Sequence, residues 1–276
     1  MNEADLRERL PNYRFYHIIP LTKDLATPGN PKHVPSQQPV LRALQALDLK
    51  GKRVLDLGCR DGLYSFTAER QGASEVVGID NDLSDGAVEL LIPYFKSSVR
   101  MYEQNLYAVS PKDFGTFDVI LCAGLLYHLR YPVWGLKVIR ELCRPKGILV
   151  LETAIFYGMA KHAMLYCPIG NEGPYGPTNC SFFNRKGLLD TLASLGWKTL
   201  SMSVLHPGEE ARHANGSQPV IDRAVLVCEY AGANDSPLTQ YWDGTHDLIS
   251  KGGIEKLRGL CAGEPSNRTG EASPSR

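Results

Sequence analysis

Long apolar runs are missing from this chain, and so is an excess of charge of either sign. No apolar stretch approaches the ~18 residues that a membrane-spanning helix needs. The 30 Lys and Arg residues balance the 30 Asp and Glu residues, so a generally basic surface for nucleic acid is not expected. Residues 1–10 are charged from the third position, which argues against a secretory signal. We therefore expect a cytoplasmic protein with no membrane partner.

Paired cysteines and metal-ligand spacings are missing as well. The seven cysteines include no Cys-x-x-Cys pair, and Cys122 and Cys228 lie inside apolar runs, as reduced buried thiols do. The histidines and cysteines at 162, 167, 206 and 213 are not spaced like zinc ligands. We predict neither a bound metal nor a disulfide framework.

What the chain does have is an alternation of short Val-, Ile- and Leu-rich runs with helical patterns. This alternation is typical of an α/β protein with a parallel sheet. Strands are predicted at 53–57, 75–79, 99–102, 117–123, 147–153, 198–204 and 223–229, and helices at 38–47, 63–71, 83–95, 134–142 and 188–195. The last two strands are expected to form a hairpin, so that one strand runs antiparallel to the rest.

Composition divides the chain into four parts. Residues 1–46 are predicted to be a lead-in segment ending in a helix, and 47–230 the α/β core. Within the core, 155–182 is rich in Gly, Pro, Tyr and Asn, and so long an irregular stretch indicates an ordered lid. Residues 231–262 are a predicted C-terminal extension, and the polar tail 263–276 is predicted to be disordered.

The stretch VLDLGCRDG at 54–62 is similar to a dinucleotide-binding turn that lacks its middle glycine. The pattern G-x-G-x-x-G lets backbone approach a pyrophosphate at a helix N-terminus. Here Arg60 stands between Gly58 and Gly62, and Asp61 adds a carboxylate that would repel a pyrophosphate. A ligand carrying an ammonium and a sulfonium would tolerate that charge, so the turn favours S-adenosylmethionine over NAD; a tight turn without any ligand is the alternative.

Further polar and small residues follow the predicted strands, where ligands of open α/β sheets bind. An acid two residues before Gly58 suits the ammonium of an amino acid, and Asp80 suits ribose hydroxyls. Asn105 either presents its amide to adenine or merely caps a turn, and Ala123 and Gly124 either leave backbone free or only pack. The predicted cofactor contacts are Asp56, Gly58, Cys59, Gly62, Asp80, Asn81, Asn105, Leu106, Ala123 and Gly124.

Five segments carry a resemblance to a known family. They are FYHIIPLTKDLATPG (15–29), DLGCRDGLYSFTAERQGA (56–73), GLLYHLRYP (124–132), LET (151–153) and DRAVLV (222–227). The chain resembles the class I S-adenosylmethionine-dependent methyltransferases and, more narrowly, the tRNA wobble-uridine methyltransferase-like family, whose members make 5-methoxyuridine and 5-carboxymethoxyuridine. The resemblance implies a Rossmann-like, seven-stranded, mostly parallel sheet with its last strand antiparallel and helices on both faces.

The resemblance also bears on individual residues. Family members often carry a bulky residue at the position of Arg60, so we expect that this turn does not need the freedom of glycine there. Tyr127 and Arg223 match a family tyrosine and arginine that face the reactive end of the cofactor or the substrate. In the carboxymethyl-transferring branch such a pair helps hold carboxy-S-adenosylmethionine, so both S-adenosylmethionine and its carboxy form stay open as donors.

Methyl transfer needs an in-line nucleophile at about 3–3.5 Å and no covalent enzyme intermediate. A hydroxyl nucleophile needs a proton acceptor, and the predicted catalytic residues are His128, Tyr127 and His17. The alternatives are that His128 bonds backbone in a turn and that His17 packs on the core. Tyr16, Tyr127 and Arg223 are the predicted substrate contacts, with a structural ion pair as the alternative for Arg223.

Three functions follow from these observations. The leading hypothesis is an enzyme that methylates an oxygen of a small molecule, because the charge is balanced and the predicted lid is aromatic. The second is a tRNA wobble-uridine methyltransferase or carboxymethyltransferase, which the resemblance favours and the charge does not. The third is a protein that binds the cofactor without catalysis. Nothing in the sequence indicates the oligomeric state.

Overall fold

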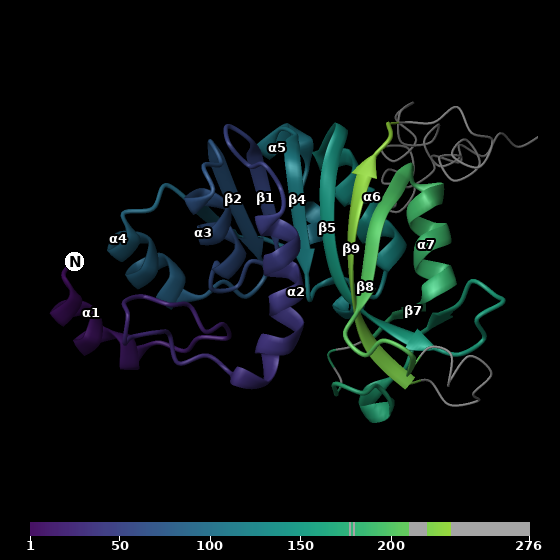
Figure 1. Ribbon diagram of the computed structural model, residues 1–276, viewed down its shortest axis with the longest axis horizontal. Coiled ribbons are helices and arrows are strands. Elements are labelled where there is room, and N and C mark those ends of the chain that lie inside the picture. The colour runs from purple at the N-terminus through teal and green to yellow at the C-terminus, as the bar shows by residue number, and fades with distance from the viewer. Residues whose placement is uncertain (177, 179, 210–219, 233–276) are drawn as a thin grey trace, which may run out of the picture. The chain divides into compact units, whose positions relative to one another are not determined.

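The computed structural model describes residues 1–176, 178, 180–209 and 220–232 (Figure 1). The helices are α1 (Glu3–Arg9), α2 (Val34–Gln45), α3 (Leu63–Arg70), α4 (Ile92–Phe95), α5 (Pro111–Phe114), α6 (Pro132–Leu142) and α7 (Arg185–Ser194). The strands are β1 (Arg53–Leu57), β2 (Glu75–Asp80), β3 (Arg100–Glu103), β4 (Phe117–Ala123), β5 (Cys143–Tyr157), β6 (Leu165–Tyr166), β7 (Phe182–Asn184), β8 (Trp197–Val204) and β9 (Val220–Tyr230). The predicted tail 263–276, and the predicted extension beyond residue 232, lie outside the described residues.

The strands form one sheet in which β3, β2, β1, β4 and β5 pair in parallel in that order. β9 pairs with β5 in antiparallel register from Ile148↔Glu229 to Tyr157↔Val220, and β8 pairs with β9. In Figure 1, β2, β1, β4, β5, β9 and β8 stand side by side in the sheet. The predicted Rossmann-like sheet with an antiparallel last strand is confirmed.

Alternation along the strands explains why the sheet is covered on both faces. In β1, Leu55 and Leu57 belong to the core cluster that contains residues of α6 and α7, whereas Val54 belongs to the cluster that contains residues of α2 and α3. Successive strand residues point to opposite faces, so a strand that is apolar at almost every position must be buried on both. The continuous apolar runs seen in the sequence are the cause of this three-layer arrangement.

The predicted bounds of β1 and β4 match the structure, but two neighbouring segments differ. β5 continues to Tyr157, so the prediction that the irregular segment begins at residue 155 was wrong. The extra residues of β5 pair with β9 on one side. On the other side β4 pairs only as far as Glu152, and beyond that point Ile155 and Phe156 pair with β7. The helix predicted at 83–95 is a π-helix at Ala87–Leu91 that leads into α4.

The double-sided core predicts a strong dependence on buried leucines of β1. Leu55→Ala removes a fully buried side chain and should lower the free energy of unfolding by about 3 kcal/mol, because the cavity adds to the lost transfer energy. Leu200→Ala, at a half-exposed position of β8, is the matched control and should change little. Urea unfolding of both variants measures the difference; equal losses would contradict the two-sided burial of β1.

Candidate cofactor and acceptor cleft

Two adjoining cavities open at the carboxyl ends of β1, β2 and β4, where open α/β sheets bind ligands. Their volumes are about 300 and 530 Å³, and both are lined by Gly58, Asp80, Asn81, Leu125 and His128. The smaller cavity adds Leu57, Ile79, Gln104, Asn105, Leu106, Tyr107, Leu129 and Arg130, and the larger adds Tyr16, His17, Arg60, Asp82, Ala123, Gly124, Tyr127 and Thr178. Because the linings share five residues, we treat them as one cleft.

The turn after β1 is held by backbone hydrogen bonds, one to β2 and one within the turn. The amide of Gly58 donates to the carbonyl of Ile79 at 2.8 Å, and that of Gly62 donates to the carbonyl of Cys59 at 2.7 Å. Gly62 has φ +81°, and a Cβ there would lie 2.3 Å from the Met101 side chain. The left-handed backbone therefore favours glycine at the start of α3, and a Cβ there would also force the end of the Met101 side chain to move.

The backbone conformation of Arg60 shows that one expectation was wrong, namely that this position of the turn does not need the conformational freedom of glycine. Its φ is +46°, in the left-handed region that costs a residue with a Cβ roughly 1–2 kcal/mol. Two interactions hold it there: its amide donates to Oδ2 of Asp80 at 2.9 Å, and its guanidinium contacts the carbonyl and carboxylate of Asp82. The turn does need a left-handed residue, and side-chain contacts supply what glycine's freedom would otherwise give.

Asp61 is turned away from the ligand side of the turn. Its Oδ2 accepts hydrogen bonds from the backbone amides of Tyr16 at 2.6 Å and His17 at 2.7 Å, and Nδ1 of His17 lies 3.2 Å away. Burial alone would raise the pKa of Asp61, but these bonds and the charge of His17 outweigh it and lower the pKa. Asp61 was expected to repel an anionic ligand, but its carboxylate binds the lead-in segment instead.

Asp80 and Asn105 line the smaller cavity and also organise local backbone. Oδ1 of Asp80 accepts from the amide of Asp82 at 2.9 Å, while its Oδ2 holds Arg60. Oδ1 of Asn105 accepts from the amide of Tyr107 at 2.9 Å, which is the capping role weighed as an alternative. Both side chains keep further hydrogen-bonding capacity toward the cavity, since a carboxylate and an amide each have more than one polar site.

Asp56, Cys59, Gly62 and Arg223 line neither cavity. Asp56 is fully buried, accepts from the Ser65 hydroxyl at 2.6 Å through Oδ2, and has no hydrogen-bond partner at Oδ1. Burial raises its pKa to about 6. A cation brought close to this carboxylate would stabilise the ionised form, since an opposite charge lowers the pKa of an acid.

Arg223 lies behind the larger cavity in a buried ion pair with Glu152, which is the alternative that the sequence left open for this residue. Its Nε and Nη2 donate to Oε1 and Oε2 of Glu152 at 2.6 and 2.7 Å, and its Nη1 donates to the Tyr127 hydroxyl at 3.0 Å. Burial alone would lower the pKa of Arg223, but the bonds to Glu152 outweigh it and raise the pKa. Burial also raises the pKa of Tyr127 to about 12, so its hydroxyl stays protonated.

His128 and His17 both line the larger cavity but are held differently. Nδ1 of His128 lies 2.9 Å from the carbonyl oxygen of Thr178, which can only accept, so Nδ1 carries the proton and Nε2 is the acceptor. Burial lowers the pKa of His128, which keeps it neutral. His17 is 4% exposed and faces Asp61. Of the two, His128 has the ring nitrogen suited to take a proton.

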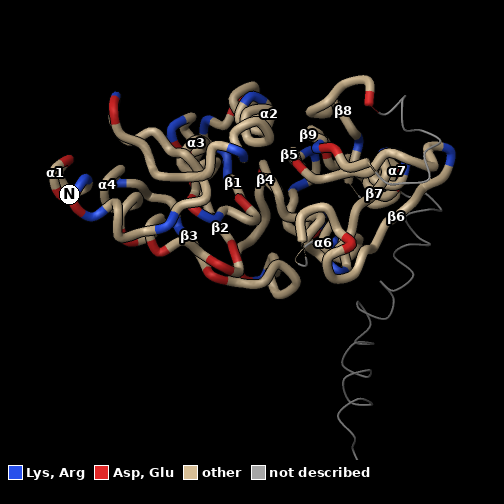
Figure 2. Tube along the Cα trace, turned by 90° about the horizontal axis from the view of Figure 1, so that it is seen from below, with Lys and Arg blue, Asp and Glu red and all other residues tan. Residues whose placement is uncertain are grey.

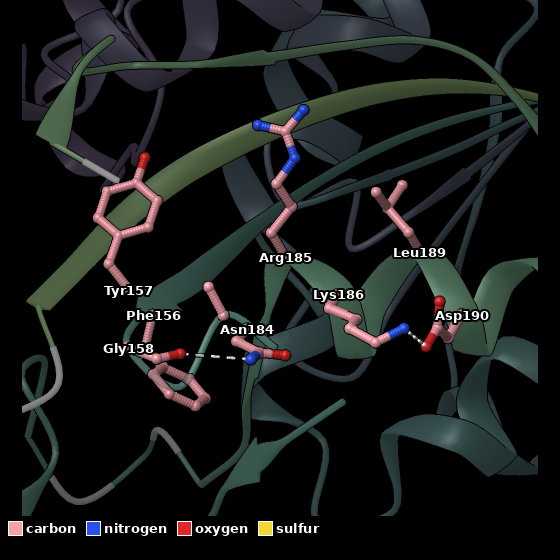
Figure 3. Close-up of a pocket in the computed structure, with 9 residues that line it drawn as sticks. Phe156, Tyr157, Gly158, Asn184, Arg185, Lys186, Leu189 and Asp190 are labelled. Carbon is pink, nitrogen blue, oxygen red and sulfur yellow. Dashed lines mark hydrogen bonds and ion pairs between the residues drawn. The ribbon is translucent and has the colours of Figure 1, made fainter. Parts of the chain in front are cut away.

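Figure 3 shows a separate cavity of about 230 Å³ between the end of β5, β7 and α7. It shares no lining residue with the cleft. Lys186 and Asp190 form an ion pair at its edge, and Nδ2 of Asn184 donates to the carbonyl of Gly158 at 3.3 Å. None of the predicted site residues lies there.

Glu152 and the role of Asp61 were not predicted from the sequence. An acidic residue directly after the apolar run 148–151 of a predicted central strand was a usable signal for Glu152, because buried carboxylates need partners. Asp61 offered no such signal, since its partners are backbone amides more than forty residues earlier in the chain.

Comparison with known proteins places the chain in a family. A family model for the methyltransferase domain matches residues 33–202, more than half of the chain. The chain belongs to the methyltransferase domain family, and the predicted class, an S-adenosylmethionine-dependent methyltransferase, is confirmed at that level.

Among similar curated proteins are tRNA U34 carboxymethyltransferases. That of Methylococcus capsulatus is 30% identical over 202 residues, covering 66% of this chain and 62% of that protein. That of Helicobacter pylori is 36% identical over 113 residues, covering 40% and 43%. The chain thus spans less than two thirds of the length of these relatives.

Similar solved structures show the fold. The N-terminal domain of EvdMO1, in the presence of SAH and D-fucose, gives a TM-score of 0.62 at 18% identity, covering 83% of this chain and 97% of that one. The 1,6-didemethyltoxoflavin-N1-methyltransferase of Burkholderia thailandensis, with bound 1,6-didemethyltoxoflavin and S-adenosylhomocysteine, gives 0.53 at 17%, covering 71% and 79%. The [4+2]-cyclase SpnF gives 0.51 at 15%, covering 82% and 92%, so the fold alone does not specify methyl transfer.

Two further findings concern the described residues. No helix among them is long and apolar enough to cross a membrane. They also contain no group of three His, Cys, Asp or Glu side chains arranged to hold a metal ion.

The buried pair of Glu152 and Arg223 predicts that removing one partner costs more stability than removing both. Glu152→Ala leaves the Arg223 guanidinium buried without its carboxylate and should lower the free energy of unfolding by about 3 kcal/mol. The double variant Glu152→Ala/Arg223→Met should lose less, because no buried charge is left unpaired. Asp190→Ala, which breaks the exposed pair with Lys186, is the control and should change little. A double variant less stable than Glu152→Ala in urea unfolding would count against this assignment.

Proposed function

We propose that the chain is an active S-adenosylmethionine-dependent methyltransferase that methylates an oxygen of a small, neutral acceptor. The observation that carries this proposal is the cleft at the carboxyl ends of β1, β2 and β4, in which a glycine turn and Asp80 meet Tyr127 and His128. The bound donor would supply an electrophilic methyl group. Membership of the methyltransferase domain family supports it.

The donor fits the residues of the smaller cavity. Asp80 would accept hydrogen bonds from the two ribose hydroxyls, while Asn105 and Leu106 would border the adenine. The backbone at Ala123 and Gly124 would face the methionine portion. Asp56 lines neither cavity and is fully buried, so the predicted contact between its carboxylate and the donor's ammonium is not part of the proposal.

The pairing of Arg223 favours a methyl donor over the carboxymethyl donor. Two of its nitrogens bond Glu152 and the third bonds the Tyr127 hydroxyl. An extra carboxylate on the transferred group would meet a guanidinium already neutralised by Glu152. We therefore infer S-adenosylmethionine, rather than its carboxy form, as the donor.

The larger cavity favours a small acceptor with an aromatic ring and a hydroxyl group. Its volume of about 530 Å³ lies in the range of small-molecule sites, and Tyr16, Tyr127 and His128 line it. The rings of these three side chains can stack on a planar acceptor, and the two tyrosines also offer phenolic hydroxyls for hydrogen bonds. Because Arg223 is paired, the site gives an anionic acceptor no unpaired partner at that position.

His128 is the proposed general base. Its Nδ1–H is held by Thr178, so Nε2 would accept the proton of the acceptor hydroxyl as the new O–CH₃ bond forms and the S–CH₃ bond breaks. Tyr127 would orient the acceptor through its hydroxyl, which Arg223 fixes. Positioning of the acceptor in line with the methyl group would supply most of the rate enhancement.

A tRNA wobble-uridine activity is the second candidate, supported by the tRNA U34 carboxymethyltransferases among the relatives. Lys and Arg are interspersed with Asp and Glu along the described trace in Figure 2. Tight binding of nucleic acid rests on phosphate neutralisation by clustered basic residues, so this distribution favours the small acceptor. A mobility shift with tRNA that weakens steeply with salt would reverse the preference. For either acceptor, a cytoplasmic location is proposed.

Donor binding is the first test. In calorimetry, the demethylated product S-adenosylhomocysteine should bind the wild-type chain, and Asp80→Ala should weaken binding at least about tenfold, as the loss of one or two hydrogen bonds predicts. Asp85→Ala, at an exposed acid in the helical segment that follows β2, is the control and should bind normally. A wild-type chain that gives no binding signal would contradict the proposed function. Binding without turnover on any acceptor pool would instead favour the non-catalytic protein considered from the sequence.

The role of His128 gives a second test, with radiolabelled methyl transfer to a pool of phenolic compounds as the readout. His128→Ala should lower the rate about 10²- to 10⁴-fold, the usual contribution of a general base. The pKa of His128 lies below the ordinary value of 6.5, so the imidazole is neutral at pH 7 and wild-type activity should be unchanged there. Activity should fall only at a pH below 6.5, where the imidazole becomes protonated. His162→Ala, at an exposed histidine, should leave the rate unchanged. A variant as active as the wild type would exclude His128 as the base.

A further inference from the structure

Residues 13–30 contribute Tyr16 and His17 to the lining of the larger cavity. The segment is folded on itself by Thr27, whose hydroxyl donates to the carbonyl of His17 at 2.6 Å and accepts from the amide of Ile19 at 2.7 Å. Gly29 packs so closely that a Cβ there would lie 2.2 Å from the carbonyl carbon of His17. This compact loop is a wall of the cavity, and we refer to residues 13–30 as the N-terminal wall.

The N-terminal wall is tied to the cofactor turn by the fully buried carboxylate of Asp61. Its Oδ2 receives the consecutive amides of Tyr16 and His17, at 2.6 and 2.7 Å. Hydrogen bonds to a carboxylate are stronger than neutral ones, and buried amides without a partner are costly. No other hydrogen bond to these two amides is recorded among the described residues, so Asp61 is their anchor.

Asp61 faces the wall because of the residue before it. Arg60 is left-handed at φ +46°, and its amide is bound by Asp80, the acid assigned to the ribose. Two successive residues of one tight turn are thus held from opposite sides, Arg60 by the donor-side acid and Asp61 by the acceptor-side wall. A shift in the position of the Asp80 side chain would therefore move the Arg60 backbone, and with it Asp61 and the N-terminal wall.

We propose that Asp61 is a positioning residue that fixes Tyr16 and His17 as the acceptor-side wall and couples their order to occupancy of the donor site. This inference rests on the proposed function, because the donor site is assigned there. Asp61 touches neither donor nor acceptor in this scheme; it acts through the backbone of the wall. By linkage, a donor that stabilises the turn must also stabilise the wall.

Hydrogen exchange of the Tyr16 and His17 amides tests the anchor without any ligand. Asp61→Ala should speed their exchange at least about tenfold, because local opening no longer breaks two bonds to a carboxylate. Asp61→Asn, which keeps the volume and an acceptor oxygen but loses the charge, should show a smaller increase. Amides of β4 report the integrity of the core and should stay protected in both variants, as they should in the exposed control Asp85→Asn.

His17→Ala separates the backbone bonds from the imidazole contact. It removes the ring that lies 3.2 Å from Asp61 but keeps both amide bonds, so exchange at Tyr16 should remain slow. Exchange as fast as in Asp61→Ala would show that the imidazole holds the wall, and would overturn the proposal.

Saturation with S-adenosylhomocysteine tests the coupling. The ligand should slow exchange of the two amides about fivefold in the wild type and have no such effect in Asp61→Ala, although that variant still binds the ligand in calorimetry. Binding without slower exchange in the wild type, or the same slowing in Asp61→Ala, would overturn the coupling while leaving the proposed function intact. Absence of binding to the wild type would instead contradict the proposed function and, with it, the inference.

Discussion

The bonds from the buried carboxylate of Asp61 to the amides of Tyr16 and His17 connect the two halves of the cleft. One half is the turn after β1, which the sheet holds through the carbonyl of Ile79. The other is a segment from the beginning of the chain that has no strand or long helix to fix it. Because Arg60 bends the backbone into the left-handed region, one short turn can serve both halves.

Three buried acids around the cleft differ in their partners and therefore in their chemistry. Asp61 accepts two backbone amides through Oδ2 and has a lowered pKa, whereas Asp56 accepts one hydroxyl and has a pKa raised to about 6; the other oxygen of each carboxylate has no hydrogen-bond partner. Glu152 is matched by Arg223, so the pair adds little net charge to the acceptor end. In the proposed scheme the turn side of the cleft receives a cationic donor, and the acceptor end suits a neutral ring beside Tyr127.

Strand positions were predictable because burial on both faces forces nearly continuous apolar runs, as in 117–123. The extension of β5 to Tyr157 was not, because its residues look like the start of an irregular segment until β9 pairs with them. The π-helix at Ala87–Leu91 was likewise predicted as an ordinary helix, since hydrophobic periodicity cannot distinguish one extra residue in a turn.

The sequence by itself determined the sheet, the turn at 54–62 and the class of the protein, because these depend on local patterns of apolar residues, glycines and acids. Only the tertiary structure decided which way the polar side chains face. Asp61, which was expected to repel an anionic ligand, instead binds two backbone amides, and of the two roles left open for Arg223 the structure shows the ion pair, with Glu152 as the partner. Their partners lie 44 and 71 residues away in the chain, and contacts over such separations exist only once the sheet has brought the segments together.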